Sequence, residues 1–364
     1  HALRHYVGVK VVGSVQGVRR INFLNIGLVR SNYKHFKPCF KIISLFGIKI
    51  MDKRRLGATG LDISPVVFGG NVFGWTIDQA QSFKVLDAFV DHGFNAIDTA
   101  DFYSIWAPNH QGGESETIIG NWLKLHPHQR EKVVLFTKVG LDMGIEGHSG
   151  LSKRWVMQGV EDSLRRLNTD YIDVYFAHWP DENTPYEETL SAFELLKQQG
   201  KIRAVGTSNL NAAQLKDSIQ AAQAMNVPHY QVLQPEYNLY DRAVFEDELR
   251  DLCTQHDIGV VSYYSLASGF LTGKYKTLAD IEGSARADSL AKYFDARGLN
   301  ILAALSEVAD RHHAQMADVA LAWVLAQPAI SAPIASATSV AQIERFAQAV
   351  QLKLSAEDLA LLNI

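Results

Sequence analysis

Strand-like and helix-like segments alternate eight times along residues 51–364. The strand-like segments are short apolar runs, and each is followed by apolar residues at helical spacing. We expect strands at residues 66–69, 94–98, 133–138, 171–176, 204–207, 232–234, 259–263 and 330–334. Because composition does not change along this stretch, the pattern predicts one α/β domain, a (β/α)8 TIM barrel. Glycines within residues 54–64 predict a short β-hairpin before the first strand.

Several helix starts carry capping signals. Thr76 is followed by Gln79, which predicts a capping box ahead of the first helix. Thr184 precedes Pro185 in a similar way, and we expect that threonine to be an N-cap. We expect helices to begin after Ser152, Thr184 and Asn211, and at residue 115.

Composition restricts the class of protein. The hydrophobic fraction of 47% is sufficient for a large core, and no apolar run approaches the roughly 20 residues that span a bilayer. Cys39 and Cys253 are the only cysteines, so we expect a reducing compartment, the cytoplasm, and no disulfide framework. Residues 51–364 carry a net charge of −13, which disfavours nucleic-acid partners.

Residues 1–50 differ from the rest, with nine Lys or Arg and no Asp or Glu. One interpretation is an organellar transit peptide, which is typically basic and poor in acids. The other, which we favour, is a non-native or upstream-translated extension ahead of Met51. We therefore expect residues 1–50 to lie outside the fold and residues 51–364 to form the barrel, so that deleting the first 50 residues leaves fold and activity intact.

Three of the expected strands are followed or ended by ionisable residues. Asp98 and Lys138 end their runs, His178 follows its run closely, and Tyr103 lies five residues after Asp98. Polar residues at the C-terminal ends of barrel strands are typical of catalytic sites. A lysine beside a phenol stabilises the phenolate and lowers the phenol pKa, and an aspartate keeps a buried lysine charged. Taken singly, however, such residues are more often caps, ion pairs or packing.

Other catalytic and binding motifs do not occur. No strand precedes a G-x-G-x-x-G segment, and the chain has no Walker motif, paired CxxC or GxSxG. His126 and His128 have metal-like spacing, but no cluster of Cys, Asp or Glu accompanies them, so we expect a surface loop and no metal site. His312 and His313 are expected near the end of a helix, where a positive charge suits the helix dipole.

The local sequences around these residues resemble the aldo-keto reductase family, bacterial type, across about residues 54–350. The matching motifs are Ile97-Asp98-Thr99-Ala100 with Tyr103, Thr137-Lys138, Gly113-Glu114-Ser115-Glu116, His178-Trp179-Pro180-Asp181 with Thr184-Pro185, Gly206-Thr207-Ser208-Asn209, Gln234-Pro235-Glu236-Tyr237-Asn238, and Tyr263 with Leu266, Gly269 and Lys274-Tyr275. The resemblance implies an oxidoreductase that reduces an aldehyde or ketone with NADP(H), NAD(H) being the alternative.

The resemblance also implies residue roles. Tyr103 is expected to be the general acid, tuned by Lys138 and Asp98, with His178 polarising the carbonyl. Ser208, Asn209 and Gln234 are expected to hold the nicotinamide and Tyr263 to stack on it. Further cofactor contacts are expected from Gly70, Asn71, Leu266, Gly269, Lys274, Arg286, Ser336, Thr338 and Gln342. Read alone, Ser208 and Asn209 could be a helix cap and Lys274 a surface lysine.

The C-terminal segment departs from the family pattern. Arg345 and Phe346 stand where the family carries the Glu and Asn that recognise adenine. The segment following His178 also resembles potassium-channel β subunits, which typically carry Asn at that position. A cofactor-binding regulatory subunit with little turnover is therefore the alternative function. The substrate pocket is expected around Phe73, Trp75, Tyr103, Trp106, Trp179 and residues 270–297, which suits a hydrophobic or sugar-ring carbonyl. The sequence does not predict an oligomeric state.

Overall fold

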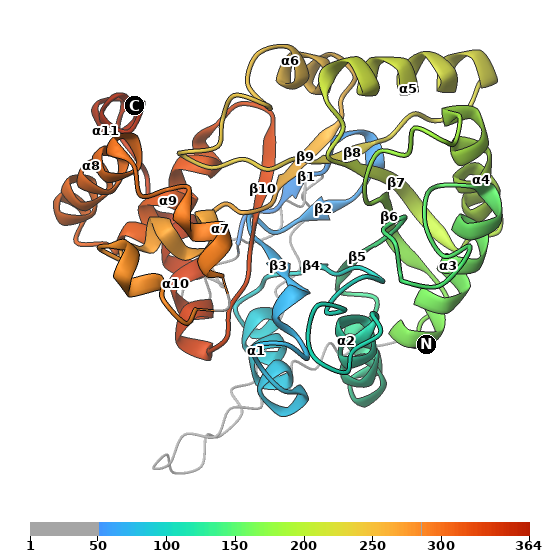
Figure 1. The fold of residues 1–364 in the computed structure, drawn as a ribbon, viewed down its shortest axis with the longest axis horizontal. Helices are drawn as coiled ribbons and strands as arrows, with labels where there is room; N and C mark the ends of the chain where they lie inside the picture. The colour runs from blue at the N-terminus through green and yellow to red at the C-terminus, as the bar shows by residue number, and fades with distance from the viewer. Residues whose placement is uncertain (1–50, 285) are drawn as a thin grey trace, which may run out of the picture. The chain divides into compact units, whose positions relative to one another are not determined.

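Eight parallel strands close into a barrel in the computed structural model, which describes residues 51–284 and 286–364 (Figure 1). The strands follow one another around the barrel in chain order, from β3 to β10, and β10 pairs with β3 to close it. The predicted (β/α)8 barrel is confirmed. The expected extension at residues 1–50, with Cys39, lies outside the described residues.

The barrel strands match the predicted runs to within two residues at either end. Their buried apolar runs form strands because helices cover the outside of the barrel and side chains fill the inside. The barrel strands are β3 (Val67–Gly69), β4 (Ala96–Asp98), β5 (Val134–Val139), β6 (Ile172–Ala177), β7 (Ile202–Ser208), β8 (Val232–Gln234), β9 (Gly259–Ser262) and β10 (Ile330–Ala335).

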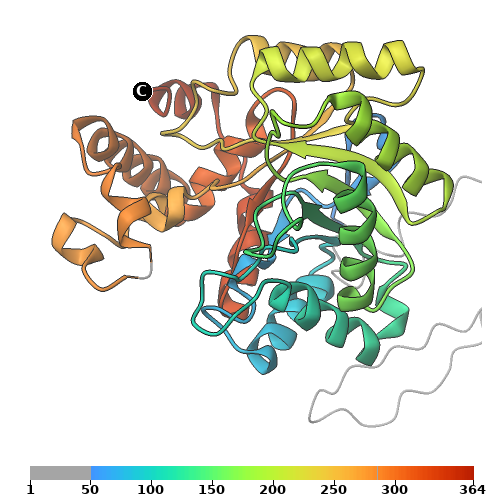
Figure 2. The ribbon, with the colours of Figure 1, turned by 45° about the vertical axis from the view of Figure 1, so that its right-hand side comes forward.

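Helices surround the barrel, and α10 closes the ring by packing against both α9 and α1. The connection from β9 to β10 is the longest and carries three helices. Figure 2 shows α7 and α8, in orange, to one side of the barrel. The helices are α1 (Gln79–Asp91), α2 (Glu114–Leu125), α3 (Lys153–Leu167), α4 (Tyr186–Gln198), α5 (Ala212–Met225), α6 (Glu248–Gln255), α7 (Ala287–Ala291), α8 (Ala296–His312), α9 (Met316–Ala326), α10 (Val340–Gln351) and α11 (Ala356–Leu361). None of the helices in the described residues is long and apolar enough to cross a membrane.

A two-stranded antiparallel hairpin closes the N-terminal end of the barrel, as predicted. It consists of β1 (Arg54–Arg55) and β2 (Asp62–Ile63). The Arg54 guanidinium donates to the carbonyl oxygens of Ile330 and Ser331 at 3.1 and 3.2 Å, which ties the hairpin to β10. Gly57 has a φ of +48°, and a Cβ there would clash with the backbone nitrogen of Gly259. The opposite, C-terminal end of the barrel is therefore the end available for a site.

Two apolar clusters hold the fold together. The larger cluster lies between the barrel and its helices and includes Trp122 and Trp323, both fully buried. The smaller cluster fills the barrel itself. It joins Leu56, Leu61 and Ile63 of the hairpin region to inward-facing strand residues such as Phe136 and Phe176. The barrel interior is thus a packed core, and it forms the floor of whatever lies at its C-terminal end.

Of the three predicted helix caps, Thr76 and Thr184 are wrong and Asn211 is confirmed. The cap of α1 is Asp78, whose carboxylate accepts from the Gln81 amide at 2.8 Å, rather than Thr76. A carboxylate next to the helix start interacts more strongly with the N-terminal dipole than a hydroxyl two residues earlier. Thr184 donates to Asp181 at 2.7 Å and does not cap α4. Ser152 and Asn211 cap α3 and α5, Asn211 within a capping box.

Candidate active site

The expected site residues continue the inward-facing rows of the barrel strands. Ala96 on β4 and Val134 and Phe136 on β5 face the barrel interior. Alternate residues of a strand share a face, so Asp98 and Lys138 occupy the next inward-facing positions. The same two-residue step places further inward positions at or just past the ends of other strands: His178, Ser208, Gln234, Tyr263 and Ser336.

Strand register brings Asp98 and Lys138 together. Asp98 pairs with Phe136 across β4 and β5, so Lys138 lies two residues further along on the same face. Its ammonium donates to Asp98 Oδ2 at 2.8 Å, to the carbonyl oxygen of Thr99 at 2.8 Å, and to the hydroxyl of Tyr103 at 3.1 Å. All three donor positions of the ammonium are thereby used.

Asp98 and Lys138 form a fully buried ion pair. Lys138 is 0% exposed and Asp98 is 2% exposed. Burial raises the pKa of Asp98 and lowers the pKa of Lys138, while the attraction between the two charges acts against both shifts. The second oxygen of Asp98, Oδ1, accepts from Nε2 of Gln234 at 2.9 Å. A buried pair is stable only when its remaining hydrogen-bonding positions are satisfied, and here they are.

Tyr103 lies in the loop between β4 and α2, with its hydroxyl beside the Lys138 ammonium. The prediction that Lys138 lowers the phenol pKa is wrong for this arrangement. Burial, and then the negative charge of Asp98, raise the pKa of Tyr103 well above its usual value. The Lys138 ammonium, although 3.1 Å from the hydroxyl, does not outweigh these two effects. Tyr103 therefore keeps its proton at neutral pH.

His178 completes the group at the end of β6. Its ring meets the ring of Tyr103 edge to face, with centroids 5.9 Å apart. Burial, and then the positive charge of Lys138, hold the pKa of His178 well below its usual value. No hydrogen bond reaches its Nδ1 from the described residues. The imidazole is thus neutral at physiological pH and retains hydrogen-bonding capacity.

Four more predicted residues form a hydrogen-bonded chain beside the ion pair. Tyr263 donates to Oδ1 of Asn209 at 2.7 Å, and the Asn209 amide donates to the Ser208 hydroxyl at 3.0 Å. Ser208 in turn donates to the backbone oxygen of Gln234 at 2.7 Å, and the Asn209 amide also donates to the backbone oxygen of His178 at 3.0 Å. These side chains line one side of the barrel mouth as a connected set.

A second group surrounds the ends of β3 and β10. Ser336 donates to Oδ1 of Asn71 at 2.7 Å. A Cβ on Gly69 or Gly70 would crowd this region, since it would come within 2.6 Å of the Ser336 hydroxyl or 2.8 Å of the Asp98 carbonyl oxygen. Thr338 and Gln342 lie next along the chain, where Gln342 Oε1 accepts from the Thr338 amide at 2.7 Å.

The predicted residues after β9 lie on the connection that runs toward α7. Leu266 and Gly269 belong to its first turn, and Gly269 has a φ of +100°, which favours glycine. The Lys274 ammonium lies 4.5 Å from the ring centre of Tyr275. The Arg286 guanidinium lies 5.5 Å from the ring centre of Trp75, on the loop after β3. Among the described residues, neither cation pairs with a carboxylate.

Comparison with known proteins identifies the family. The model described as "Aldo/keto reductase family" matches residues 65–364. The chain belongs to the aldo/keto reductase family. It is 34% identical over 319 residues to "Uncharacterized oxidoreductase YrpG" of Bacillus subtilis, covering 86% of this chain and 95% of that protein. It is 32% identical over 362 residues to "Aldo-keto reductase AMT2" of Alternaria alternata, covering 90% of this chain and 95% of that protein.

Another relative has a different name. The chain is 33% identical over 308 residues to "Probable voltage-gated potassium channel subunit beta" of Arabidopsis thaliana, covering 83% of this chain and 92% of that protein. The family, together with the names of the Bacillus subtilis and Alternaria alternata relatives, supports an oxidoreductase of the aldo/keto reductase type.

The two residues that depart from the aldo/keto reductase pattern are engaged in the fold. Arg345 on α10 pairs with Asp318 on α9, and its Nε lies 3.1 Å from Oδ1. Phe346 is buried and meets Phe94 edge to face at 6.4 Å. Both side chains therefore contribute to the packing of α10, Phe346 as a buried ring and Arg345 through its ion pair with Asp318.

Some residues of the site region carried no signal in the sequence. The Thr99 carbonyl oxygen binds Lys138, but a backbone atom has no sequence signature. Asp101 is buried behind the site, and no hydrogen bond from the described residues reaches its carboxyl oxygens. Burial and the neighbouring Glu116 raise the pKa of Asp101 well above its usual value, against an opposing effect of Arg166.

The two histidine pairs noted in the sequence, His126 with His128 and His312 with His313, lie away from the site. His126 ends α2, and its ring lies 6.2 Å from the ring of His128. His312 lies in the last turn of α8, as predicted, and contacts Asp358 of α11 at 2.8 Å, while His313 is the C-cap. The described residues contain no group of three or more His, Cys, Asp or Glu side chains that could hold a metal ion.

Proposed function

We propose that this protein reduces an aldehyde or ketone to an alcohol, with NADPH as hydride donor and Tyr103 as general acid. The observation that carries the proposal is the position of the Lys138 ammonium, 2.8 Å from the Asp98 carboxylate and 3.1 Å from the Tyr103 hydroxyl. This arrangement gives the phenol a cation that can stabilise it once its proton has left.

The residues at the barrel mouth fit a nicotinamide dinucleotide. Ser208, Asn209 and Gln234 offer amide and hydroxyl groups for the carboxamide, and Tyr263 offers an aromatic face. Lys274 and Arg286 are cations that no carboxylate of the described residues neutralises, which suits a pyrophosphate.

The far end of the proposed cofactor site suits a further phosphate. The cap residue of α10, Ser339, makes no side-chain capping bond, so backbone N–H groups of its first turn remain available to an anion. The hydroxyls of Ser336 and Thr338 lie just before this turn. We therefore propose NADP(H), with NAD(H) as the alternative. Gly70, Asn71, Leu266, Gly269 and Gln342 complete the proposed contacts.

The proposed chemistry divides between cofactor and protein. When bound, the reduced nicotinamide supplies a hydride to the carbonyl carbon. Tyr103 then gives its hydroxyl proton to the carbonyl oxygen, so one C–H and one O–H bond form and the C=O bond becomes a single bond. The high pKa of Tyr103 means that this proton leaves only as negative charge develops on the oxygen. The Lys138 ammonium stabilises the phenolate that remains, and Asp98 keeps Lys138 charged and in place.

His178 is proposed to position the carbonyl. Its lowered pKa keeps the ring neutral, so it can donate one N–H to the carbonyl oxygen without competing with Tyr103 as the proton source. Its ring lies edge to face against the ring of Tyr103, so the two side chains are neighbours at the proposed carbonyl position.

We further propose residues 51–364 as the catalytic unit and the cytoplasm as its location.

The alternative is a cofactor-binding regulatory subunit with little turnover. The similarity to the Arabidopsis thaliana relative named as a channel β subunit favours it. The presence of His178 within the Asp98, Tyr103 and Lys138 group favours the enzyme, because the ring is held neutral at the position where a carbonyl would be oriented.

The test begins with fluorescence titration of the purified protein with NADPH and with NADH, followed by turnover of 4-nitrobenzaldehyde. Tight NADPH binding with turnover is expected. Cofactor binding without turnover of any aldehyde would favour the regulatory subunit, and failure to bind either cofactor would overturn both proposals.

The Tyr103→Phe variant assigns the acid. It removes only the hydroxyl, so we expect kcat to fall about 10²- to 10⁴-fold while NADPH affinity changes little. Tyr186→Phe is the matched control, since it removes a phenol hydroxyl from α4, which is not part of the proposed site. Substantial residual kcat in Tyr103→Phe would refute the role of Tyr103.

A further inference from the structure

We propose that a cleft beside Asp98, Tyr103, Lys138 and His178, together called the tetrad, binds the tail of the carbonyl substrate. We propose further that this tail is neutral and hydroxylated, as in a small sugar. The inference rests on the proposed reductase function and names its substrate class. The cleft has a volume of about 430 Å³ and lies between the loop after β5 and the loop after β6. That volume is at the lower end of the range for small-molecule sites.

The cleft begins where two of the proposed catalytic strands end. Gly140, on one wall, lies two residues after Lys138, and Trp179, on the other, directly follows His178. Because both walls begin within two residues of a proposed catalytic residue, we place the substituent of the carbonyl against them. The cleft is thus placed to contact the part of the substrate that does not react.

Hydrogen bonds hold the two loops in a fixed relation. The Gly150 amide donates to the Gly140 carbonyl oxygen at 2.9 Å, which closes the base of the first loop. The carboxylate of Asp181 in the second loop accepts from the Leu151 amide at 2.7 Å and from the Thr184 hydroxyl at 2.7 Å. Burial acts to raise the pKa of Asp181, but these bonds outweigh it and hold the pKa below its usual value. Asp181 thus serves the loops themselves.

The charge of the lining excludes an anionic tail. Asp142 and Asp181 are the only charged residues that line the cleft, and no Lys, Arg or His is among the lining residues. Asp142 is exposed and accepts from the Gly144 amide at 2.8 Å through Oδ1, while no described residue bonds to its Oδ2. A phosphate or carboxylate placed here would meet two negative charges and no cation, whereas a hydroxyl could donate to Asp142.

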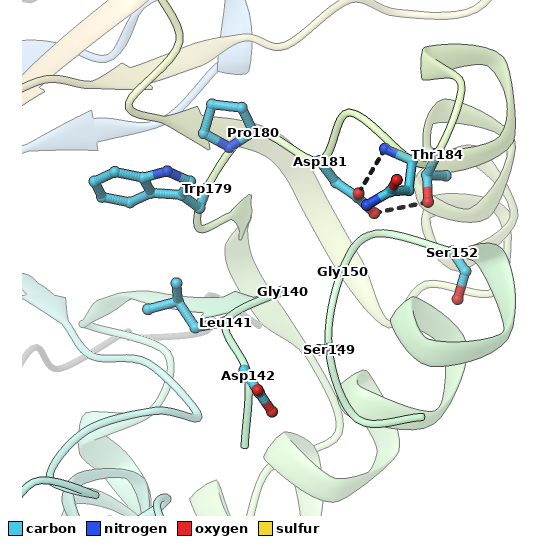
Figure 3. Close-up of a pocket in the computed structure, with 11 residues that line it drawn as sticks. Gly140, Leu141, Asp142, Ser149, Gly150, Ser152, Trp179, Pro180, Asp181 and Thr184 are labelled. Atoms are coloured by element: carbon cyan, nitrogen blue, oxygen red, sulfur yellow. Dashed lines mark hydrogen bonds between the residues drawn. The ribbon is translucent and has the colours of Figure 1, made fainter. Parts of the chain in front are cut away.

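The lining changes from apolar to polar along the cleft. Figure 3 shows Trp179 and Leu141 at one end and Asp181, Thr184 and Ser152 at the other. Trp179 is exposed, and its ring offers a flat surface to the C–H face of a carbon chain or ring. A tail with carbons near the carbonyl and hydroxyls further out matches this order. A cationic tail would have Asp142 alone to pair with, because Asp181 already accepts from Leu151, Asn183 and Thr184. A tail with several hydroxyls can bond to Asp142 and also to the hydroxyl and backbone groups of the lining.

The test compares four aldehydes with NADPH. D-erythrose has the proposed hydroxylated tail, D-erythrose 4-phosphate adds an anion, butanal lacks the hydroxyls, and betaine aldehyde has a cationic tail. We expect kcat/KM for D-erythrose to exceed the other three by about tenfold or more. Equal or better use of the phosphate, of butanal or of betaine aldehyde would overturn the inference while leaving the reductase in place. Turnover of none of the four, nor of 4-nitrobenzaldehyde, would overturn the proposed function and the inference with it.

Two variants connect this preference to the cleft. Asp142→Asn is expected to raise the ratio of phosphate to neutral erythrose use about two- to fivefold, the range for an exposed charge pair, with the gain shrinking in high salt. Trp179→Ala is expected to lower kcat/KM about tenfold for D-erythrose and for butanal alike, because both have a carbon chain for the ring to contact, with Trp179→Phe largely restoring both. Glu146→Gln is the matched control, because Glu146 is an exposed carboxylate on the same loop outside the lining. An unchanged phosphate ratio in Asp142→Asn, or the same change in Glu146→Gln, would overturn the assignment.

Discussion

Gln234 and Asp98 meet across the barrel, where Nε2 of Gln234 donates to Oδ1 of Asp98 at 2.9 Å. Their strands, β8 and β4, are four places apart in the closed order of eight and so lie on opposite sides of the barrel. This bond fixes the Asp98 carboxylate with its other oxygen toward Lys138. A residue of the proposed nicotinamide pocket therefore also orients the ion pair beneath the proposed acid.

Gln234→Leu should weaken the fold and the reaction together. The variant leaves Asp98 Oδ1 buried without a donor, so we expect a loss of about 1–3 kcal/mol in the free energy of unfolding. Urea unfolding measures this loss, and kcat for an aldehyde is expected to fall as the ion pair loses its orientation. Gln223→Leu on the exposed side of α5 is the control and should change neither quantity. Wild-type stability in Gln234→Leu would contradict the importance of the bond.

Lys138→Met should be more damaging to stability than removal of both charges. The single variant leaves the Asp98 carboxylate buried without its cation, which costs about 3–5 kcal/mol. The double variant Asp98→Asn with Lys138→Met removes the uncompensated charge and is expected to recover part of that loss in urea unfolding. Aldehyde turnover should remain lost in both. If the double variant were no more stable than the single one, the ion pair would not explain the loss.

Asp101→Asn should stabilise the protein increasingly as pH rises. An unfolded aspartate ionises near pH 3.8, but in the folded protein the raised pKa keeps Asp101 protonated to higher pH. Between these two values, rising pH favours the unfolded wild-type chain by up to about 1.4 kcal/mol per pH unit, and the asparagine variant escapes this penalty. Urea unfolding at pH 5 and pH 8 measures the difference. Asp170→Asn, at an exposed aspartate, should show no such trend, and a pH-independent gain in Asp101→Asn would refute the shift.

Gly57→Ala should destabilise the barrel more than Gly60→Ala, although both glycines have positive φ. A methyl group at Gly60 meets no atom within 4 Å, so only the backbone cost of about 1–2 kcal/mol applies. At Gly57 the added carbon would clash with the backbone of Gly259, and the hairpin must move away from the barrel. Thermal unfolding of the two variants compares the costs. Equal melting temperatures would mean that the hairpin is not held tightly at this point.

The fold and the grouping of the tetrad could be predicted because both depend on local pattern. Asp98, Lys138 and His178 are at strand ends, and parallel strands place all their C-terminal ends together. Each of these residues also lies two positions after an inward-facing apolar residue, as Lys138 does after Phe136 and His178 after Phe176. Alternation along the strands alone therefore indicates which polar residues face the barrel axis.

The features that could not be predicted from the sequence depend on the relative strength or position of groups that are brought together only in the folded chain. The pKa of Tyr103 rises because burial and Asp98 together outweigh Lys138, and a list of neighbours gives the partners without their relative strengths. The cap of α1 is Asp78 rather than the predicted Thr76 for a similar reason, since the path of the chain decides which side chain meets the start of the helix. The contact of Gln234 with Asp98 joins residues 136 positions apart and has no local signature.

The inward-facing residues at the C-terminal ends of the barrel strands limit how this protein can evolve. Asp98 and Lys138 lie on strands whose other inward residues form the core, so an insertion of one residue in either strand would turn its charged side chain outward. The cleft between Gly140 and Thr184, by contrast, is built only from loops. Changes in the length or the charged residues of those loops could change the substrate while the proposed catalytic residues and their chemistry stay the same.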